Sequence, residues 1–249
     1  MRLLVLGGTT EASRLAAALA DHPQIATTLS LAGRTAAPAA LPVPTRVGGF
    51  GGMEGLAEYL QAERIGAVVD ATHPFAARIS AHAVAACARA AVPLLAFSRA
   101  PWTAEAGDRW TAVADIGAAV NALAALPATA VFLTTGRLDL AAFRAAPHHR
   151  YLVRTIDPPT EHDRLPGMTL VLGRGPFTIA DEAALMAHHG IALLVTKNSG
   201  GDASAAKLAA ARRLGVPVLM VARPAVPPRP TTDRLDAVLA WLARHAPPR

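Results

Sequence analysis

The chain has 249 residues, of which 52% are hydrophobic and 17% charged, so it can bury a large core as one domain or two. The single cysteine, Cys87, excludes an internal disulfide and a thiolate metal cage, and the formal net charge of +6 comes from scattered arginines, which favours small polyanionic ligands over nucleic acid. The apolar stretch 81–97 is interrupted by Arg89 and Pro93, and the apolar start of the chain is too short for a signal sequence, so we expect a cytoplasmic protein with no membrane partner.

Short apolar runs typical of strands alternate with stretches typical of helices along the whole chain. Strands are expected at residues 3–6, 27–31, 67–69, 94–97, 130–134, 151–154, 170–172, 193–196 and 218–221. Helices are expected at residues 11–20, 53–62, 76–90, 116–126, 138–144, 179–188, 203–213 and 232–243. This alternation predicts the α/β class, with parallel sheets flanked by helices on both faces.

A stretch of weaker periodicity, residues 98–110, divides the chain into two halves that end alike. Residues 91–101 and 215–224 both contain Val-Pro, an apolar strand, and an arginine close to a proline. We therefore predict two Rossmann-like domains, a coenzyme-binding domain at residues 1–101 and a second, ligand-binding domain at residues 102–249. The default position for a ligand is then a cleft between them.

The first predicted strand runs into a glycine turn and a helix, which is the arrangement of a phosphate site. Backbone N–H groups and the positive end of the helix dipole face the turn. In the dinucleotide fingerprint G-x-G-x-x-G/A, Gly7 and Ala12 match the first and last positions, whereas Thr9 replaces the middle glycine. The turn, residues 7–12, is therefore a candidate phosphate site.

The second predicted strand ends without the acid that commonly binds the adenosine ribose. The segment is Ser30-Leu31-Ala32-Gly33-Arg34-Thr35, in which an arginine and two hydroxyl groups suit a 2′-phosphate. NADP is therefore favoured over NAD, and the alternative is a surface arginine in a loop. The next glycine-rich segment, residues 48–52, is either a place where the backbone approaches a ligand or a mobile loop.

Residues 70–76, Asp-Ala-Thr-His-Pro-Phe-Ala, follow a buried strand at the sheet edge where ligands bind in such folds. Thr72 and His73 are candidates for contact with the nicotinamide or the substrate, and a structural histidine is the alternative. Asp70 is expected to serve as a turn or cap residue, and Pro74 to start a helix.

In the second half, cationic side chains recur where predicted strands end. Arg137 follows Thr135 and Gly136, Arg154 ends a strand, Arg174 lies in a Gly-Arg-Gly-Pro turn, and Lys197 is one of only two lysines. Thr178 is a candidate N-cap for the helix that follows. Several cations on one rim predict a ligand with several carboxylates or phosphates. Metal ligation is not expected, because the adjacent pairs His148-His149 and His188-His189 cannot share one face of a regular element.

Six segments taken together resemble one known family. They are residues 7–12 (GGTTEA), 70–76 (DATHPFA), 98–102 (SRAPW), 135–137 (TGR), 175–177 (GPF) and 196–201 (TKNSGG), and they span nearly the whole chain in order. The chain is similar to the precorrin-6A reductase family of cobalamin biosynthesis. The resemblance implies that NADPH reduces one ring double bond of precorrin-6A, or of its cobalt-bearing equivalent, to give precorrin-6B.

The resemblance also implies a division of roles among the residues. Those expected to bind NADPH are Gly7, Gly8, Thr9, Thr10, Glu11, Ala12, Ser30, Gly33, Arg34, Thr35 and Thr72. Those expected to bind the tetrapyrrole carboxylates are Arg14, Arg99, Thr135, Gly136, Arg137, Arg154, Arg174, Lys197 and Ser199. His73 is the candidate proton donor, with a solvent proton as the alternative, and no metal site is expected.

Two other functions are compatible with the residues alone, and partners beyond the substrate follow from the pathway. One is an NADP-dependent reductase of another polyanionic metabolite, and the other is a non-catalytic dinucleotide sensor. Neighbouring enzymes of the pathway are candidate protein partners of a precorrin-6A reductase.

Overall fold

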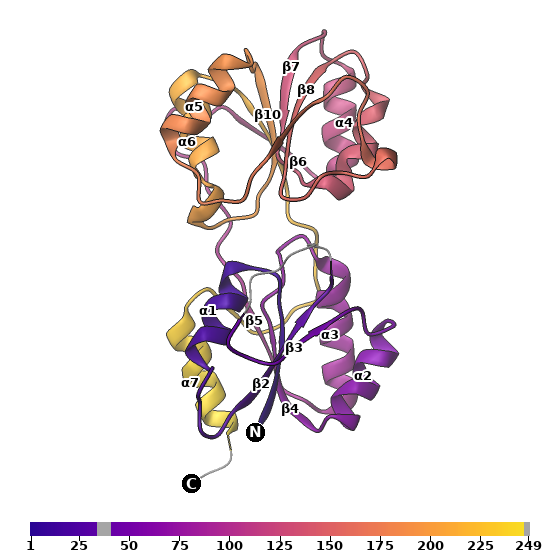
Figure 1. Ribbon diagram of the computed structural model, residues 1–249, viewed down its shortest axis with the longest axis vertical. Coiled ribbons are helices and arrows are strands. Elements are labelled where there is room, and N and C mark those ends of the chain that lie inside the picture. The colour runs from indigo at the N-terminus through magenta and orange to yellow at the C-terminus, as the bar shows by residue number, and fades with distance from the viewer. Residues whose placement is uncertain (34–40, 247–249) are drawn as a thin grey trace. The chain divides into compact units, whose positions relative to one another are not determined.

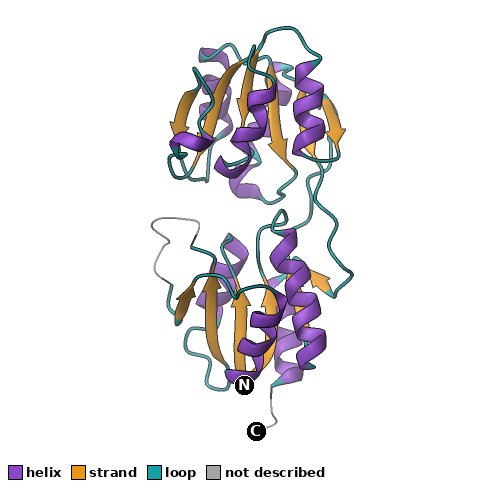
Figure 2. Ribbon diagram, turned by 90° about the vertical axis from the view of Figure 1, so that its right-hand side faces the viewer, coloured by secondary structure: helices purple, strands orange, loops and turns teal. Residues whose placement is uncertain are grey.

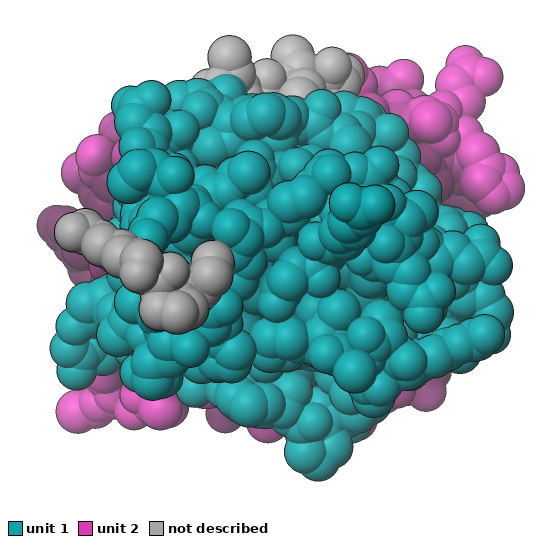
Figure 3. Space-filling model, turned by 90° about the horizontal axis from the view of Figure 1, so that it is seen from below, with its two compact units in different colours: residues 1–100, 225–249 teal, residues 101–224 magenta. Residues whose placement is uncertain are grey.

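The computed structural model describes residues 1–33 and 41–246, and it divides the chain into two compact units. Unit 1 comprises Met1–Ala100 and Ala225–Arg249, and unit 2 comprises Pro101–Pro224 (Figure 3). The first division between the units falls between Ala100 and Pro101, close to the expected boundary at residue 101. The expectation that one domain extends from residue 102 to residue 249 is wrong, because residues 225–249 return to unit 1, where they supply a strand and a helix.

Unit 1 is a six-stranded parallel sheet with helices on both faces (Figure 1). Its strands are β1 (Arg2–Leu6), β2 (Ala26–Leu31), β3 (Thr45–Val47), β4 (Ile65–Asp70), β5 (Leu94–Phe97) and β12 (Thr231–Thr232). Its helices are α1 (Thr10–Ala18), α2 (Met53–Ala62), α3 (Ala77–Ala90) and α7 (Leu235–His245). The strand order is β12-β5-β4-β1-β2-β3. The last strand and helix of the chain thus complete the sheet that the first strand begins.

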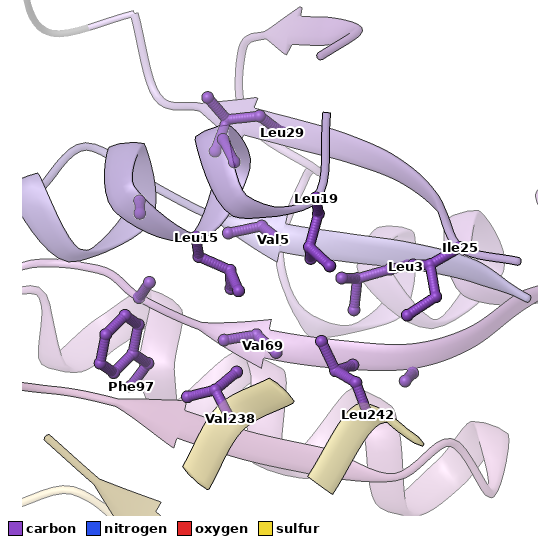
Figure 4. Close-up of a cluster of buried hydrophobic side chains, with 14 of the residues drawn as sticks. Leu3, Val5, Leu15, Leu19, Ile25, Leu29, Val69, Phe97, Val238 and Leu242 are labelled. Atoms are coloured by element: carbon purple, nitrogen blue, oxygen red, sulfur yellow. The ribbon is translucent and has the colours of Figure 1, made fainter. Parts of the chain in front are cut away.

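The central strand β1 is buried on both faces because its alternate side chains point to opposite sides of the sheet. Leu3 and Val5 face α1 and α7, where Leu15 and Val238 meet them in one core cluster (Figure 4). Leu4 faces the other way and belongs to the cluster beneath α2 and α3. All five side chains are fully buried, and each such side chain contributes roughly 1.5–3 kcal/mol to folding.

Unit 2 has the same architecture, a six-stranded parallel sheet between layers of helices (Figure 2). Its strands are β6 (Trp110–Val113), β7 (Ala130–Leu133), β8 (Arg150–Thr155), β9 (Thr169–Leu172), β10 (Leu193–Lys197) and β11 (Val218–Val221). Its α-helices are α4 (Ile116–Ala124), α5 (Ile179–His188) and α6 (Ala206–Leu214), and its 3-10 helices are η1 (Arg137–Ala145), η2 (Glu161–Asp163) and η3 (Asp202–Ser204). The strand order is β6-β11-β10-β7-β8-β9.

The helix expected at residues 138–144 is present as η1, which is a 3-10 helix. Leu140 and Phe143 are its buried residues, both fully enclosed, and they lie three positions apart. In a 3-10 helix residues i and i+3 share one face, so this spacing presents both side chains to the core together. On the other face of the sheet, α5 and α6 cover a cluster that includes Phe132 and Leu194.

Both sheets have the strand order of a dinucleotide-binding fold, in which the chain winds outward in opposite directions from two central strands. These central strands are β1 and β4 in unit 1, and β7 and β10 in unit 2. Residues 91–101 and 215–224, which are alike in sequence, contain β5 and β11, the equivalent strands next to β4 and β10. Within residues 1–33 and 41–246, no helix is long and apolar enough to cross a membrane.

Candidate functional site

The first candidate site lies at the switch point of unit 1, where the carboxyl ends of β1 and β4 are neighbours. Thr9 connects the two sides. Its Oγ1 accepts a hydrogen bond from the Ala12 backbone N–H at 3.2 Å and donates one to the Ala71 carbonyl at 2.7 Å. The threonine that departs from the fingerprint is therefore the N-cap of α1 and also fixes this turn to the strand across the switch point.

Gly7 and Gly8 suit this turn for different structural reasons. A Cβ on Gly7 would lie 2.5 Å from Cδ1 of the buried Leu29, so a larger residue would displace that side chain on β2. Gly8 has φ +114° and open space where a Cβ would be, and both Gly8 and Thr10 are exposed. The first N–H groups of a helix lack partners inside the helix. The exposed turn can therefore accept a phosphate close to the backbone, as the sequence predicts.

The carboxyl end of β2 holds Ser30, whose carbonyl accepts the Gly7 N–H at 2.9 Å. Its hydroxyl accepts a hydrogen bond at 2.8 Å from Arg46 of β3, a residue that the sequence analysis does not single out. Gly33 follows with φ +71°. Arg34 and Thr35, which are expected to bind a 2′-phosphate, lie outside the described residues.

Asp70 at the end of β4 is the centre of a buried polar network. Its Oδ1 accepts hydrogen bonds from the N–H and the hydroxyl of Thr72, at 3.1 and 2.6 Å, and its Oδ2 accepts from Ser80 at 2.7 Å. Arg229, from the segment that returns to unit 1, completes the network at 3.1 Å. Asp70 therefore fixes the orientation of Thr72 and, by accepting the N–H two residues on, serves as the expected turn residue. The alternative role, a helix cap, is not seen, since α3 begins at Ala77 without a side-chain cap.

His73 lies half-buried in the loop that follows. Its Nδ1 accepts a hydrogen bond from the Phe75 backbone N–H at 3.2 Å, and the two rings are 5.9 Å apart. A neutral imidazole whose Nδ1 is an acceptor carries its proton on Nε2. His73 thus has a defined tautomer, which is what a candidate hydrogen-bond or proton donor requires.

Two arginines expected to bind substrate, Arg14 and Arg99, belong to unit 1. Arg99 forms an ion pair at 3.2 Å with Glu11 in the first turn of α1, and both side chains are less than one-fifth exposed. Because this pair offsets the negative charge of Glu11, the helix N-terminus keeps its attraction for an anion. Arg14 of α1 is exposed.

The second candidate site is the equivalent switch point of unit 2, where the carboxyl ends of β7 and β10 are neighbours. Lys197 at the end of β10 forms an ion pair with Asp139 of η1, whose chain follows β7. In the turn between β7 and η1, Gly136 has φ +89°. The hydroxyl of Thr135 in the same turn is buried without a hydrogen-bond partner among the described residues. The segments that contain Arg137 and Lys197 are therefore brought together, as the sequence predicts.

The loop after β10 is held by a side-chain clamp that sequence reasoning missed. Asn198 accepts from the Trp102 N–H at 2.7 Å and donates to the Trp102 carbonyl at 3.0 Å. Arg223 donates to the carbonyls of Asn198 and Ser199, at 2.9 and 3.1 Å. The indole of Trp102 also donates to the Gly201 carbonyl at 3.0 Å. The Lys-Asn-Ser-Gly-Gly loop is therefore fixed at several points, and Ser199 takes its position from it.

Comparison with known proteins now decides the family. A family model described as Precorrin-6x reductase CbiJ/CobK matches residues 2–243. The chain belongs to the precorrin-6x reductase family. It is 56% identical over 249 residues to the Precorrin-6A reductase of Rhodobacter capsulatus, covering 100% of this chain and 98% of that one. A solved structure titled CobK precorrin-6A reductase has a TM-score of 0.92 and 55% identity, covering 100% and 99% of the two chains.

A more distant relative carries a related name. The Cobalt-precorrin-6A reductase of Priestia megaterium is 31% identical over 183 residues, which cover 70% of this chain and 71% of that relative. The family resemblance read from the sequence motifs is therefore confirmed over the whole chain.

In this member of the precorrin-6x reductase family, Arg154 is not on the surface rim where the sequence analysis places it. Its guanidinium forms a bidentate ion pair with Glu182, the two side chains being 7% and 2% exposed. It also lies over the rings of Phe177 at 3.8 Å and Phe132 at 5.1 Å. The guanidinium charge of Arg154 is therefore compensated inside unit 2, and its expected contact with substrate stays a prediction.

Arg174 remains a surface residue of this family member, in the turn between β9 and α5. The turn is held closely on both sides. A Cβ on Gly175 would lie 2.4 Å from the Ala203 carbonyl oxygen, and Phe177 covers Arg154. Thr178 caps α5 by accepting from the Asp181 N–H at 3.1 Å, which confirms its expected role as N-cap. The buried Arg154 therefore supports the turn from which Arg174 projects.

Proposed function

We propose that this chain catalyses the reduction of one ring double bond of precorrin-6A by NADPH, giving precorrin-6B. The observation that carries the proposal is the 56% identity, over 100% of this chain and 98% of the relative, to a protein named Precorrin-6A reductase. The reaction balances when one hydride and one proton add across a carbon–carbon double bond and NADPH leaves as NADP⁺.

The residues of unit 1 fit a nicotinamide dinucleotide. Gly7 permits the close packing of the turn, Gly8 leaves its outer side open, and the N-terminus of α1 favours the diphosphate. Thr9 fixes this turn to β4, and the Asp70 network orients Thr72 beside it. NADPH, when bound, supplies the hydride. The chain contributes orientation, which is a large part of the acceleration available to a reaction between two bound reactants.

The residues of unit 2 fit a polycarboxylate. Arg137, Arg174 and Lys197, together with the hydroxyl of Ser199, would bind acetate and propionate side chains of the macrocycle, with Thr135 and Gly136 shaping the turn. The pairing of Lys197 with Asp139 holds the ammonium group at the switch point before substrate binds. Arg14 and Arg99 would bind carboxylates from unit 1.

His73 is the proposed proton donor, because its Nε2 carries the proton when Nδ1 accepts the Phe75 N–H. A proton from solvent would serve instead if the histidine only orients the substrate. The two cases separate in the pH profile of kcat for His73→Asn. Loss of an ionisation with a fall of about 100-fold or more in kcat supports the donor, and an unchanged profile assigns the proton to solvent.

The proposed substrate is the metal-free precorrin. The relative named Precorrin-6A reductase matches at 56% over the whole chain, whereas the one named Cobalt-precorrin-6A reductase matches at 31% over 70% of it. The ratio of kcat/KM for the two substrates tests this choice.

The whole proposal is tested by incubating the purified chain with NADPH and precorrin-6A without oxygen, and following NADPH oxidation together with the mass of the tetrapyrrole. We expect NADPH consumption that depends on precorrin-6A, and a product heavier by two hydrogen atoms. NADPH binding without turnover on either form of the precorrin would instead support a dinucleotide sensor. Turnover only with another polyanionic metabolite would reject the substrate.

A further inference from the structure

Arg46 occupies a position that neither the motifs nor the family resemblance singles out. It lies on β3, which pairs with β2 so that Arg46 is opposite Ser30 at the carboxyl end of that strand. Its Nη1 donates to the Ser30 hydroxyl at 2.8 Å and to the Gly48 carbonyl at 3.1 Å, and its Nη2 donates to the Gly49 carbonyl at 3.1 Å. The guanidinium is thus fixed where a dinucleotide-binding sheet meets the adenosine ribose.

The glycine-rich loop forms an aromatic platform beneath this guanidinium. Its central carbon lies 3.9 Å from the ring centroid of Phe50 and 5.2 Å from that of Tyr59, and the two rings meet edge to face. The loop is closely packed on α2, since a Cβ on Gly55 would lie 1.8 Å from the Phe50 carbonyl oxygen. The segment 48–52, for which the sequence left a ligand contact and a mobile loop open, therefore holds an arginine in one orientation.

The charge of Arg46 is not neutralised by the part of the chain that the structure describes. All three of its hydrogen-bond acceptors are uncharged, and no carboxylate within residues 1–33 and 41–246 forms an ion pair with it. These bonds use three of the five guanidinium N–H groups, which leaves Nε–H and one Nη2–H to donate elsewhere. A half-buried, oriented arginine with donors to spare is suited to bind a phosphate.

We propose that Arg46 binds the 2′-phosphate of the coenzyme and determines the preference for NADPH over NADH. The proposal rests on the proposed function, because it takes a nicotinamide dinucleotide to lie along the carboxyl edge of unit 1. Ser30 and the carbonyls of Gly48 and Gly49 are positioning groups, since they direct the guanidinium without touching the phosphate. Phe50 supports the guanidinium from one face.

The test compares ligands that differ only in the 2′-phosphate, and it needs no tetrapyrrole. Dissociation constants for 2′,5′-ADP and 5′-AMP, and for NADPH and NADH, are measured by calorimetry for the intact chain and for Arg46→Met and Arg46→Lys. Charge-assisted hydrogen bonds contribute about 1.5–3 kcal/mol, so Arg46→Met is expected to weaken 2′,5′-ADP and NADPH about 10- to 100-fold. Affinity for 5′-AMP and NADH is expected to stay within about twofold, because neither ligand carries the phosphate.

Two further variants sharpen the result. Arg46→Lys keeps the charge but loses the planar fork and its stacking on Phe50, so it is expected to recover only part of the preference. Arg2→Met removes the same charge from unit 1 at the amino end of β1, where Arg2 forms an exposed ion pair with Glu63, and is expected to leave all four affinities unchanged. A charge effect that acts at a distance would appear equally in Arg2→Met.

The outcomes separate this inference from the proposed function. If the unaltered chain prefers NADPH and Arg46→Met retains that preference, Arg46 does not bind the 2′-phosphate and the proposed function stands. Equal weakening of NADPH and NADH by Arg46→Met also overturns the inference, because it assigns Arg46 to a part that both coenzymes share. If the unaltered chain binds neither coenzyme, the proposed function itself fails.

Discussion

Replacing the buried Arg154 gives the sharpest test of how unit 2 is built. In Arg154→Met the carboxylate of Glu182, 2% exposed, keeps its burial but loses the guanidinium that compensates it. Breaking a buried pair from one side costs about 3–5 kcal/mol, a large share of the 5–15 kcal/mol that typically separates folded from unfolded protein. With a urea dependence of about 2 kcal/mol per molar, the unfolding midpoint of unit 2 should fall by roughly 2 M.

The double variant Arg154→Met with Glu182→Leu removes both charges. The Met side chain can pack between Phe132 and Phe177, whose ring centroids lie 5.1 and 3.8 Å from the Arg154 guanidinium. Because replacing a whole buried pair by apolar residues is often neutral, we expect the double variant to recover at least about half of the lost stability.

Urea titrations followed by tryptophan fluorescence in a Trp241→Phe background measure these changes in unit 2, because the other two tryptophans, Trp102 and Trp110, belong to that unit. Alkylation of Cys87 reports on the unfolding of unit 1 and serves as the control. The urea concentration at which Cys87 becomes reactive should be the same in all variants. A cost below about 1 kcal/mol for Arg154→Met, or no recovery in the double variant, refutes the reasoning about the buried pair. If the double variant is stable but has a raised KM for the tetrapyrrole, the result would support a contact of Arg154 with substrate.

Three further predictions concern single residues. Thr9→Val removes the cap of α1 and the bond to Ala71, so it should cost about 1–2 kcal/mol in unit 1 by urea titration and weaken NADPH binding, whereas unaltered stability would mean that the turn holds without it. Burial, and secondly the charge of Asp70, raise the pKa of the Cys87 thiol from 9.0 to about 12, so the folded chain keeps a proton that the unfolded chain loses. The free energy of unfolding of unit 1 should therefore fall as the pH rises from about 9 to about 12, and it should fall more steeply in the unaltered chain than in Cys87→Ala. Equal pH dependences in the two proteins would contradict the burial of the thiol. Lys197→Met should raise the KM for precorrin-6A several-fold without changing the dissociation constant for NADPH, and a changed coenzyme affinity with an unchanged KM would reject the assignment.

The sequence predicts the central strands of both sheets and the edge strand β9, but it misses the edge strands β3, β6 and β12. The strands at residues 3–6, 67–69, 193–196 and 218–221 are confirmed because they are buried on both faces and therefore read as continuous apolar runs. β12 has two residues, both threonine, and β6 exposes its two central side chains. Neither has an apolar pattern to detect, since pairing with a single neighbouring strand is what makes each of them a strand.

The candidate site divides in a similar way. Motifs that consist of neighbouring residues could be recognised from the sequence. Two of them, the turn at residues 7–12 and the segment that holds Thr72 and His73, lie at one switch point, as expected. Pairs formed by distant residues carry no local signal, which is why the partner of Asp70, Arg229, was missed. Arg154 shows the opposite error, since the sequence analysis places a buried side chain on the surface rim. A residue at the end of a strand has the same sequence pattern whether its side chain is exposed there or forms a buried ion pair.

The fold of unit 1 depends on both ends of the chain, because β12 and α7 complete the sheet that contains β1. Residues 1–100 alone would lack β12 and α7, and so would expose the face of β4 and β5 on which α7 packs, Val69 and Phe97 among its side chains. The two buried α7 side chains, Val238 and Leu242, alone contribute roughly 3–6 kcal/mol of burial, comparable with the stability of a whole domain. The same segment carries Arg229, whose guanidinium compensates the buried Asp70 carboxylate that orients Thr72. The last strand and helix are therefore needed twice, once to close the core and once to keep the end of β4 in the arrangement that the coenzyme would meet.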